Sequence, residues 1–133
     1  MPDLNLVPQR LCASADLRER EGSVLFAVLE YGRSTPAFAV RADQQAVAYL
    51  NRCAHVPTEL DWQPGEFWDH EQKFIICSVH GALYEPAHGQ CLMGPCAGKR
   101  LVPVPLKEEG GQVFWLPSDR FQPVPEPTKA PVP

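Results

Sequence analysis

Short apolar runs separated by turn residues make up most of the chain between residues 24 and 116. Runs of this length, bounded by glycine, proline and polar residues, are typical of β-strands. Six segments are expected to form strands: 24–31, 36–41, 46–50, 73–77, 100–106 and 112–116. Because no long amphipathic helix accompanies them, the pattern predicts an all-β fold, either a sandwich or a small barrel.

Three local features refine this expectation. Asp43 and Gln44 lie between the second and third segments and predict the turn of a hairpin. Pro103 and Pro105 place the fifth segment at a sheet edge, because proline cannot donate a hydrogen bond to a neighbouring strand. Ser14 is expected to cap a short helical turn that follows it.

The two ends of the chain carry no strand pattern. Residues 1–12 predict a flexible arm. Residues 117–133 contain six prolines, which leave too few backbone donors to join a sheet, and they predict a disordered tail. A single domain is therefore expected over residues 13–116.

Length and composition indicate one ordinary globular domain. A chain of 133 residues is long enough for one hydrophobic core, and 44% hydrophobic with 21% charged residues is usual for a soluble protein. The longest apolar run, residues 24–29, is far too short to span a bilayer, and no signal-peptide pattern opens the chain. We therefore expect a cytoplasmic protein.

Charge is distributed unevenly along the chain, whose net charge is −4. Six acidic residues between positions 53 and 98 stand against one basic residue, Lys73. They are Glu59, Asp61, Glu66, Asp69, Glu71 and Glu85. Such a segment disfavours binding to nucleic acid or to an anionic membrane surface. It suits docking onto a basic patch of a partner protein; the alternative is a solvated face that charge keeps soluble.

Two short motifs carry candidate metal chemistry. Cys53-Ala54-His55 and Cys77-Ser78-Val79-His80 each place one thiolate and one imidazole within a single loop. Two cysteines on one iron and two histidines on the other can hold a two-iron, two-sulfide cluster. Zinc also accepts two cysteines and two histidines, but structural zinc sites usually pair like with like. The mixed pairs therefore favour the iron–sulfur cluster over zinc.

The stretches CAHVPTEL, FIICSVHGALYEP and GQCLMGP resemble the cluster-binding region of Rieske iron–sulfur proteins, and the likeness extends over about residues 20–116. The resemblance implies one Rieske-type [2Fe-2S] cluster. It implies that Cys53 and Cys77 hold one iron, and that His55 and His80 hold the other through ring nitrogens. It also implies an antiparallel β-sandwich or barrel with an inserted cluster-binding subdomain, here at about 52–98.

Four positions bear on the reduction potential. High-potential Rieske proteins of respiratory cytochrome bc complexes brace the two ligand loops with a disulfide, where this chain has Thr58 and Val79. They also place a serine hydroxyl near a bridging sulfide, where this chain has Ala82. Tyr84 acts in the opposite direction, because its hydroxyl can donate to a ligand sulfur. We predict a potential in the lower half of the Rieske range of about −150 to +300 mV.

The neighbourhood of the motifs supplies further candidates for cluster binding. Gly81 and Gly94 are expected to permit close backbone approach to the cluster, and Pro95 to stiffen a loop that covers it. The alternative is that both are turn glycines with no cluster contact. Aromatic residues between positions 62 and 68 form either a rim for a partner or the small core of the subdomain, and we favour the core.

The other cysteines and histidines are assigned less specific roles. Cys91 and Cys96 are extra ligands, a loop disulfide or inert thiols, of which we favour inert or weakly redox-active thiols. Cys12 is expected to be structural. Three non-ligand cysteines, an odd number, argue against a disulfide framework. His70 and His88 are expected at the surface, because both lie in polar turn sequences.

The resemblance implies a soluble one-electron carrier, the ferredoxin component between a reductase and a terminal oxygenase or reductase. It would dock through the tip that holds His55 and His80. Ring-hydroxylating oxygenases add a catalytic domain whose mononuclear iron uses two histidines and a carboxylate. No residues remain for such a domain, so catalysis by this chain alone is not expected.

Two alternatives stay open: a small subunit of a nitrite-reductase-like assembly, and a redox or iron sensor that signals through Cys91 and Cys96. The expected partners are redox proteins, without nucleic acid or membrane, and the chain is expected to be a monomer or a weak oligomer.

Overall fold

The computed structural model describes residues 4–54, 58–61, 63–78, 81–94 and 98–125. Strands dominate this part of the chain, and its one helical element is the 3₁₀ turn η1, Ser14–Asp16. The prediction of an all-β fold is confirmed. The described residues contain no helix that is long and apolar enough to cross a membrane.

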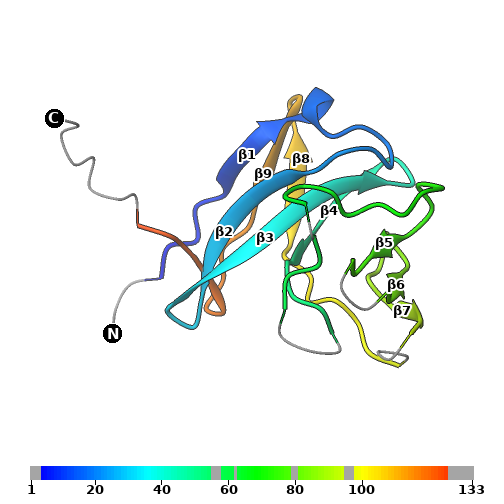
Figure 1. Ribbon diagram of the computed structural model, residues 1–133. Coiled ribbons are helices and arrows are strands. Elements are labelled where there is room, and N and C mark those ends of the chain that lie inside the picture. The colour runs from blue at the N-terminus through cyan, green and yellow to red at the C-terminus, as the bar shows by residue number, and fades with distance from the viewer. Residues whose placement is uncertain (1–3, 55–57, 62, 79–80, 95–97, 126–133) are drawn as a thin grey trace, which may run out of the picture.

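The strands form three antiparallel sheets (Figure 1). The first has the order β1-β9-β8, with β1 Gln9–Ala13, β9 Gln112–Trp115 and β8 Leu106–Glu109. The second has the order β10-β2-β3-β4, with β10 Phe121–Pro123, β2 Val24–Glu30, β3 Arg33–Ala42 and β4 Gln45–Leu50. The third has the order β5-β6-β7, with β5 Ile75–Ile76, β6 Leu83–Tyr84 and β7 Cys91–Met93. The small third sheet lies at the end of the molecule away from both termini (Figure 1).

The hairpin between β3 and β4 turns at Asp43 and Gln44, as predicted. Their φ angles of 52° and 67° are the left-handed values of a two-residue type I′ turn, whose twist matches that of the flanking strands. Neither residue is glycine, so the conformation needs support from elsewhere. The Glu19 carboxylate supplies it by accepting both backbone N–H groups of the turn at 2.7 Å.

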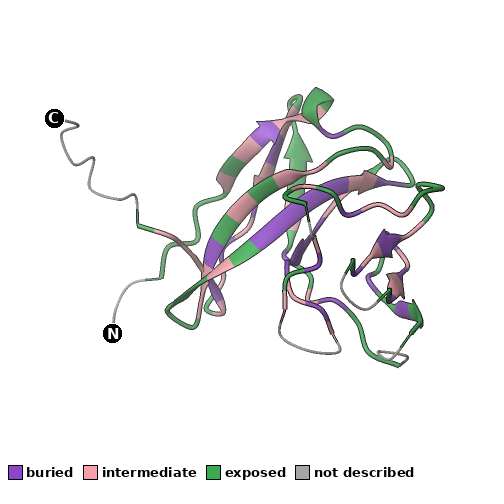
Figure 2. Cartoon of the chain, viewed as in Figure 1, coloured by how far each residue is buried: buried purple, intermediate pink, exposed green. Residues whose placement is uncertain are grey.

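Strand β3 is buried on both of its faces (Figure 2). Side chains alternate along a strand, so Phe38 and Val40 enter one core while Ala37 and Ala39 enter another. The second core lies between the two larger sheets and contains Val113 and other strand residues. The first core lies under the small sheet, where the Phe38 ring stacks on Phe67 with 3.8 Å between ring centroids. Strand β3 thus joins the large sheets to the small one.

Two local predictions are wrong. Residues 100–106 do not form a strand; β8 begins only at Leu106, and before it Pro103 makes an isolated bridge to Tyr49. The two prolines remove the N–H groups that a ladder needs. Ser14 does not cap a helical turn either. Instead η1 begins after Ala13, whose N–H donates to the Asp16 carboxylate at 3.0 Å.

The ends of the chain contribute more to the sheets than predicted. The flexible arm was expected over 1–12, but residues 9–12 belong to β1, which pairs with β9. The disordered tail was expected over 117–133, but residues 121–123 form β10, which pairs with β2. Because β10 is an edge strand, Pro123 is tolerated in it. The tail beyond residue 125 lies outside the described residues.

Candidate metal centre

The cysteines of the two motifs each lie shortly after a strand, Cys53 after β4 and Cys77 after β5. The first loop comes after β4, and the Cys53 N–H donates to the carbonyl of Thr58 at 2.8 Å. The second comes after β5, and the Cys77 N–H donates to the carbonyl of Ala82 at 2.9 Å. The Gly81 N–H also donates to the Cys77 carbonyl at 2.7 Å, so each cysteine is tied by backbone hydrogen bonds to a residue that follows it.

The two cysteines lie in one buried core beside Tyr84. Cys53 is 3% exposed, and Cys77 and Tyr84 are fully buried. The Tyr84 hydroxyl lies 3.3 Å from Cys53 Sγ and accepts the Ala54 N–H at 3.0 Å. A thiolate can only accept, so Tyr84 is the donor when Cys53 is ionised. The arrangement therefore aims one hydroxyl donor at the sulfur.

Burial raises the pKa of the Tyr84 hydroxyl, and its hydrogen bond to Cys53 raises it further. The negative charges of Cys53 and Cys77 act in the same direction. Tyr84 thus stays protonated at the neutral pH values at which proteins are usually studied, and its O–H remains available as a donor.

The donor set of these loops fits an iron–sulfur centre. The two cysteine sulfurs, the predicted thiolate ligands, lie in one apolar core together with Leu60 and Ala82, which keep water away from them. His55 and His80, the predicted imidazole ligands, lie outside the described residues. The structure therefore brings together the thiolate half of the predicted ligand set.

Gly94 makes its close approach to the second ligand loop. A Cβ atom at this position would lie 3.0 Å from Ala82 Cα, and the φ angle of +107° also favours glycine. Gly81 has a φ angle of +72°, and a Cβ there would meet no described protein atom within 4 Å. Both glycines thus permit left-handed backbone conformations in the loops, and Gly94 also permits close packing on Ala82. Their predicted approach to the cluster stays a prediction. Pro95 lies outside the described residues.

Cys91 is disulfide-bonded, so the favoured prediction of an inert or weakly redox-active thiol is wrong for it. It lies on β7, where it pairs with Tyr84 of β6. Cys96 lies outside the described residues. Cys12 is a buried thiol of the core between the large sheets, in keeping with a structural role, and burial raises its pKa.

The remaining candidates divide between surface and core. His70 and His88 are exposed, as predicted, and the His88 ring contacts the Glu85 carboxylate at 2.9 Å. Phe67 is fully buried, which supports the core interpretation of the aromatic segment. Trp68 is half-buried and donates through Nε1 to the Gly22 carbonyl at 3.0 Å.

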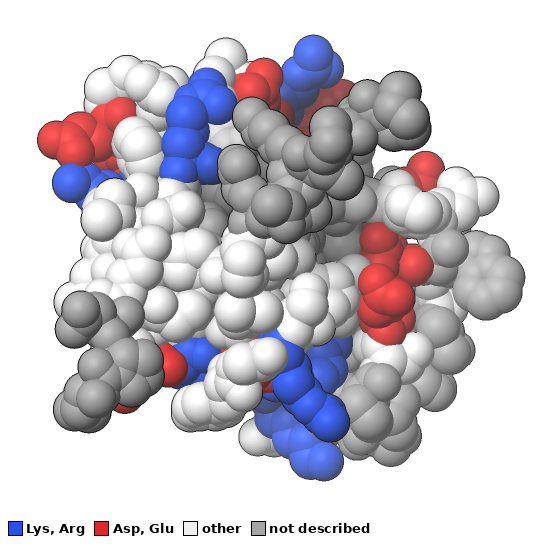
Figure 3. Space-filling view, turned by 90° about the vertical axis from the view of Figure 1, so that its left-hand side faces the viewer, with Lys and Arg blue, Asp and Glu red and all other residues white. Residues whose placement is uncertain are grey.

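The side of the molecule opposite the small sheet has few charged residues at its centre (Figure 3). Figure 3 faces this side and shows a broad uncharged area with charged residues at its margins. Large apolar side chains are exposed near the start of the chain, on β2 and just after it, and on β7 of the small sheet: Leu4, Leu6, Val7, Leu25, Tyr31, Leu92 and Met93. The acidic residues noted above belong instead to the segment that carries the cysteines.

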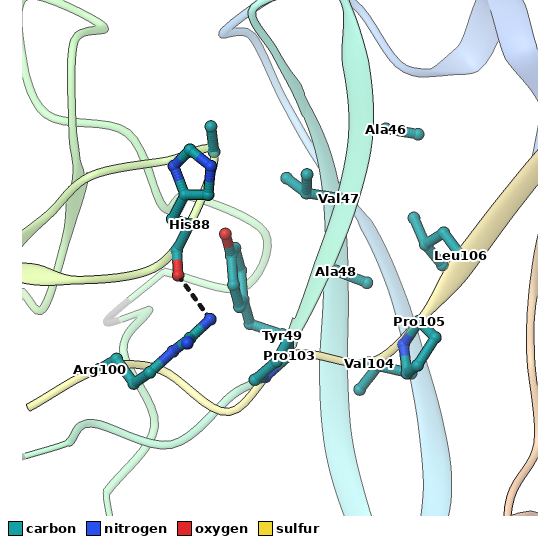
Figure 4. Close-up of a pocket in the computed structure, with 11 residues that line it drawn as sticks. Ala46, Val47, Ala48, Tyr49, His88, Arg100, Pro103, Val104, Pro105 and Leu106 are labelled. Carbon is teal, nitrogen blue, oxygen red and sulfur yellow. Dashed lines mark hydrogen bonds between the residues drawn. The ribbon is translucent and has the colours of Figure 1, made fainter.

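A hollow of about 210 Å³ lies at the joint between β4 and the segment after β6 (Figure 4). Tyr49 crosses this joint and donates to the Pro86 carbonyl at 2.6 Å. Arg100 donates to the His88 carbonyl at 3.0 Å. Neither cysteine of the candidate centre lines the hollow. The Tyr49 contact holds the segment after β6 against β4, so the hollow marks the place where two parts of the fold pack together.

Comparison with known proteins places this geometry in context. The model of the Rieske [2Fe-2S] domain family matches residues 7–117. No curated protein sequence matches the chain.

Solved structures are similar in fold. The ferredoxin of carbazole 1,9a-dioxygenase from Nocardioides aromaticivorans IC177 has a TM-score of 0.62 at 20% identity, over 84% of this chain and 99% of the ferredoxin. A chain in the complex of reduced oxygenase and oxidized ferredoxin in carbazole 1,9a-dioxygenase has a TM-score of 0.61 at 20% identity, over 84% of this chain and 94% of that one. The terminal oxygenase of the Nocardioides system has a TM-score of 0.63 at 21% identity, over 91% of this chain but 32% of the oxygenase.

Proposed function

Since the chain belongs to the Rieske [2Fe-2S] domain family and its cofactor is one cluster of that type, we propose that Cys53 and Cys77 bind one of its irons. His55 and His80 bind the other through ring nitrogens. The observation that carries this assignment is the pair of buried cysteines that share one core with Tyr84. Gly81, Gly94 and Pro95 shape the loops around the cluster.

When bound, the cluster supplies the capacity to take up and release one electron. The residues of the chain set the conditions for this exchange. The Tyr84 hydroxyl donates to Cys53 Sγ and so stabilises negative charge on that sulfur. The Ala54 N–H holds the hydroxyl in place, and Ala82 excludes water from the thiolates.

We propose that the protein is a one-electron carrier between a reductase and a terminal oxygenase or reductase. In the carbazole system a ferredoxin of similar fold forms a complex with an oxygenase, and the likeness covers nearly all of such a ferredoxin. The acidic segment beside the ligand loops suits a basic docking site on the partner. The proposal includes a cytoplasmic protein that is a monomer or a weak oligomer, which gel filtration and cell fractionation test.

The alternative of a redox sensor has one observation in its favour. The disulfide-bonded Cys91 pairs with Tyr84, the residue that contacts Cys53. A sensor changes its affinity for a partner with the state of its redox groups, whereas a carrier transfers electrons at each encounter. Partner affinity measured in both oxidation states separates the two.

The assignment of the ligands is tested on freshly purified protein. Visible, EPR and iron analyses are expected to show one reducible [2Fe-2S] centre that is lost on Cys53→Ala and on His80→Ala. Cys12→Ala serves as the matched control and should keep the spectrum. A colourless protein with one bound zinc ion, or an intact spectrum in His80→Ala, overturns the assignment.

Electron transfer is tested by mixing the reduced protein with a basic one-electron acceptor such as cytochrome c. If the acidic segment guides docking, the second-order rate should fall steeply as ionic strength rises. Glu66→Gln with Glu71→Gln, two exposed acids of the segment, should reduce both the rate and its salt dependence. A reduced cluster that transfers no electron to any such acceptor contradicts the role of carrier.

A further inference from the structure

We propose that Asn51 is a positioning residue that fixes the first ligand loop against the second, and so sets the lifetime and the potential of the cluster. The inference rests on the proposed ligation by Cys53 and Cys77. It concerns a residue two positions before Cys53 that acts through the backbone of both ligand loops.

Asn51 is the only residue of the polar and charged types that is buried in the described part of the chain, at 5% exposure. Its Oδ1 accepts the Leu60 N–H at 2.7 Å, and its Nδ2 donates to Asp61 Oδ1 at 2.7 Å and, over a longer 3.5 Å, to Glu59 Oε1. Only this orientation of the amide satisfies both partners, because an N–H needs an acceptor and a carboxylate needs a donor.

These bonds connect the two ends of the first ligand loop. Asn51 precedes the loop, and Leu60 follows its closing residue Thr58, so the amide forms a second tie below the bond between Cys53 N–H and Thr58 O. The loop is thereby closed in two successive layers.

The same chain of contacts reaches the second loop. The Leu60 carbonyl accepts the N–H of Ser78, the residue directly after Cys77, at 2.9 Å. On its other side, Asp61 Oδ2 accepts the Gly65 N–H at 2.9 Å. Asn51 therefore lies at the centre of a line of hydrogen bonds from the turn at Gly65 to the start of the second ligand loop.

Hydrogen bonds, not a disulfide, hold the two ligand loops together at this point of the structure. Positions 58 and 79 are threonine and valine, so no disulfide can join the loops there. In a buried setting each bond of a satisfied polar network counts for more than at the surface, and breaking one leaves its partner without compensation. A network of this kind restricts how far the two cysteines move relative to one another when charge is added to the cluster.

Exchange of donors and acceptors provides a sharp test. Asn51→Asp keeps the oxygen that Leu60 needs but sets two carboxylates against each other. Asp61→Asn keeps one oxygen but replaces the other, so that Asn51 and the Gly65 N–H compete for a single acceptor. The double variant N51D/D61N restores the bond between positions 51 and 61 with reversed polarity, because the amide introduced at position 61 would donate to the carboxylate at position 51 and accept from Gly65. It does not restore the longer 3.5 Å contact to Glu59, which would then join two carboxylates.

The matched control is Asn5→Asp, the same chemical change at the only other asparagine. The Asn5 side chain accepts the Val7 N–H near the start of the chain, and an aspartate can do the same.

The measurements are the half-life of the visible circular dichroism of the holoprotein, its EPR spectrum and its reduction potential. Each single variant should lose its cluster about 10-fold to 100-fold faster and shift the potential and the g-values. The double variant should return all three readouts most of the way to the wild-type values, because it loses only the long contact to Glu59. Asn5→Asp should leave them unchanged.

A cluster of normal lifetime and potential in Asn51→Asp overturns the proposal. So does a double variant as impaired as the single variants, because the network would then not be the cause. If the wild-type protein binds no cluster at all, the proposed ligation fails instead, and the two failures are distinguishable.

Discussion

Replacing Tyr84 by phenylalanine removes the hydroxyl that faces the first cysteine while leaving the ring in its buried site. Two bonds are lost: the 3.3 Å contact to Cys53 Sγ and the acceptor of the Ala54 N–H. A hydrogen bond to a charged group contributes about 1.5–3 kcal/mol. Reduction adds negative charge to the cluster and its sulfur ligands, so the bond is stronger in the reduced state. Its removal should therefore lower the potential.

The magnitude follows from the part of this energy that differs between the two oxidation states, which we take as about 1 kcal/mol. For one electron, about 59 mV corresponds to about 1.4 kcal/mol, so the expected decrease is about 40 mV. Protein-film voltammetry of wild type and Tyr84→Phe under one buffer measures it.

The matched control is Tyr49→Phe, which also removes a buried tyrosine hydroxyl, here the one that donates to the Pro86 carbonyl at 2.6 Å. It should cost about 1 kcal/mol of unfolding free energy and leave the potential unchanged. An unchanged or raised potential in Tyr84→Phe would refute the reasoning, and an equal decrease in Tyr49→Phe would show that the effect is not specific to the sulfur.

Three further outcomes are expected. Gly89→Ala places a Cβ 2.7 Å from the Tyr49 ring at a φ angle of +77° and should lower the unfolding free energy by about 2–4 kcal/mol. Gly110→Ala, which meets no described atom within 4 Å, should cost only about 1 kcal/mol in the same denaturant titration, and equal costs would exclude the clash as the cause. Glu30→Gln should lower the unfolding free energy by about 1 kcal/mol, because the hydrogen bond from Arg52 lowers the Glu30 pKa in the folded state. This contribution is present above the ordinary carboxyl pKa and lost as pH falls through the folded value, so a difference between wild type and variant that grows on acidification would contradict it. Burial raises the pKa of Tyr49, so the unfolded state alone ionises above pH 10.0, and stability should fall there. Thermal melts at rising pH should show a shallower loss in Tyr49→Phe, and identical slopes would disprove the assignment.

The hairpins and the cysteine loops were predictable because their signals are local. Asp43 and Gln44 mark their turn through residue type alone, and the spacing within each motif places a cysteine at the start of each loop. Apolar runs also located β2, β3 and β4 to within a few residues.

The errors at the two chain ends concern pairings between distant segments. Strand β1 exists because β9, about a hundred residues later, offers it an edge, and β10 exists because β2 does the same. Neither segment has enough alternation of apolar and polar residues to predict a strand from its own sequence. Cys91 was misjudged for a related reason, since a disulfide depends on the approach of two positions in space.

Asn51 shows the same limit within the candidate site. In the sequence it is one polar residue after an apolar run and resembles an ordinary strand end. Its importance arises from Leu60 and Asp61, which lie about ten residues ahead and reach it only after the first ligand loop has folded back. Burial of a polar side chain with every partner supplied is a property that appears only in three dimensions.

The double burial of β3 couples the behaviour of the two halves of the molecule. Phe38 and Val40 support the core that holds the cysteines, while Ala37 and Ala39 support the core between the large sheets. Neither half can melt without exposing one side of this shared strand to water. Unfolding should therefore be a single cooperative event, and the free energy of binding the iron should stabilise even the distant sheet of β1, β8 and β9.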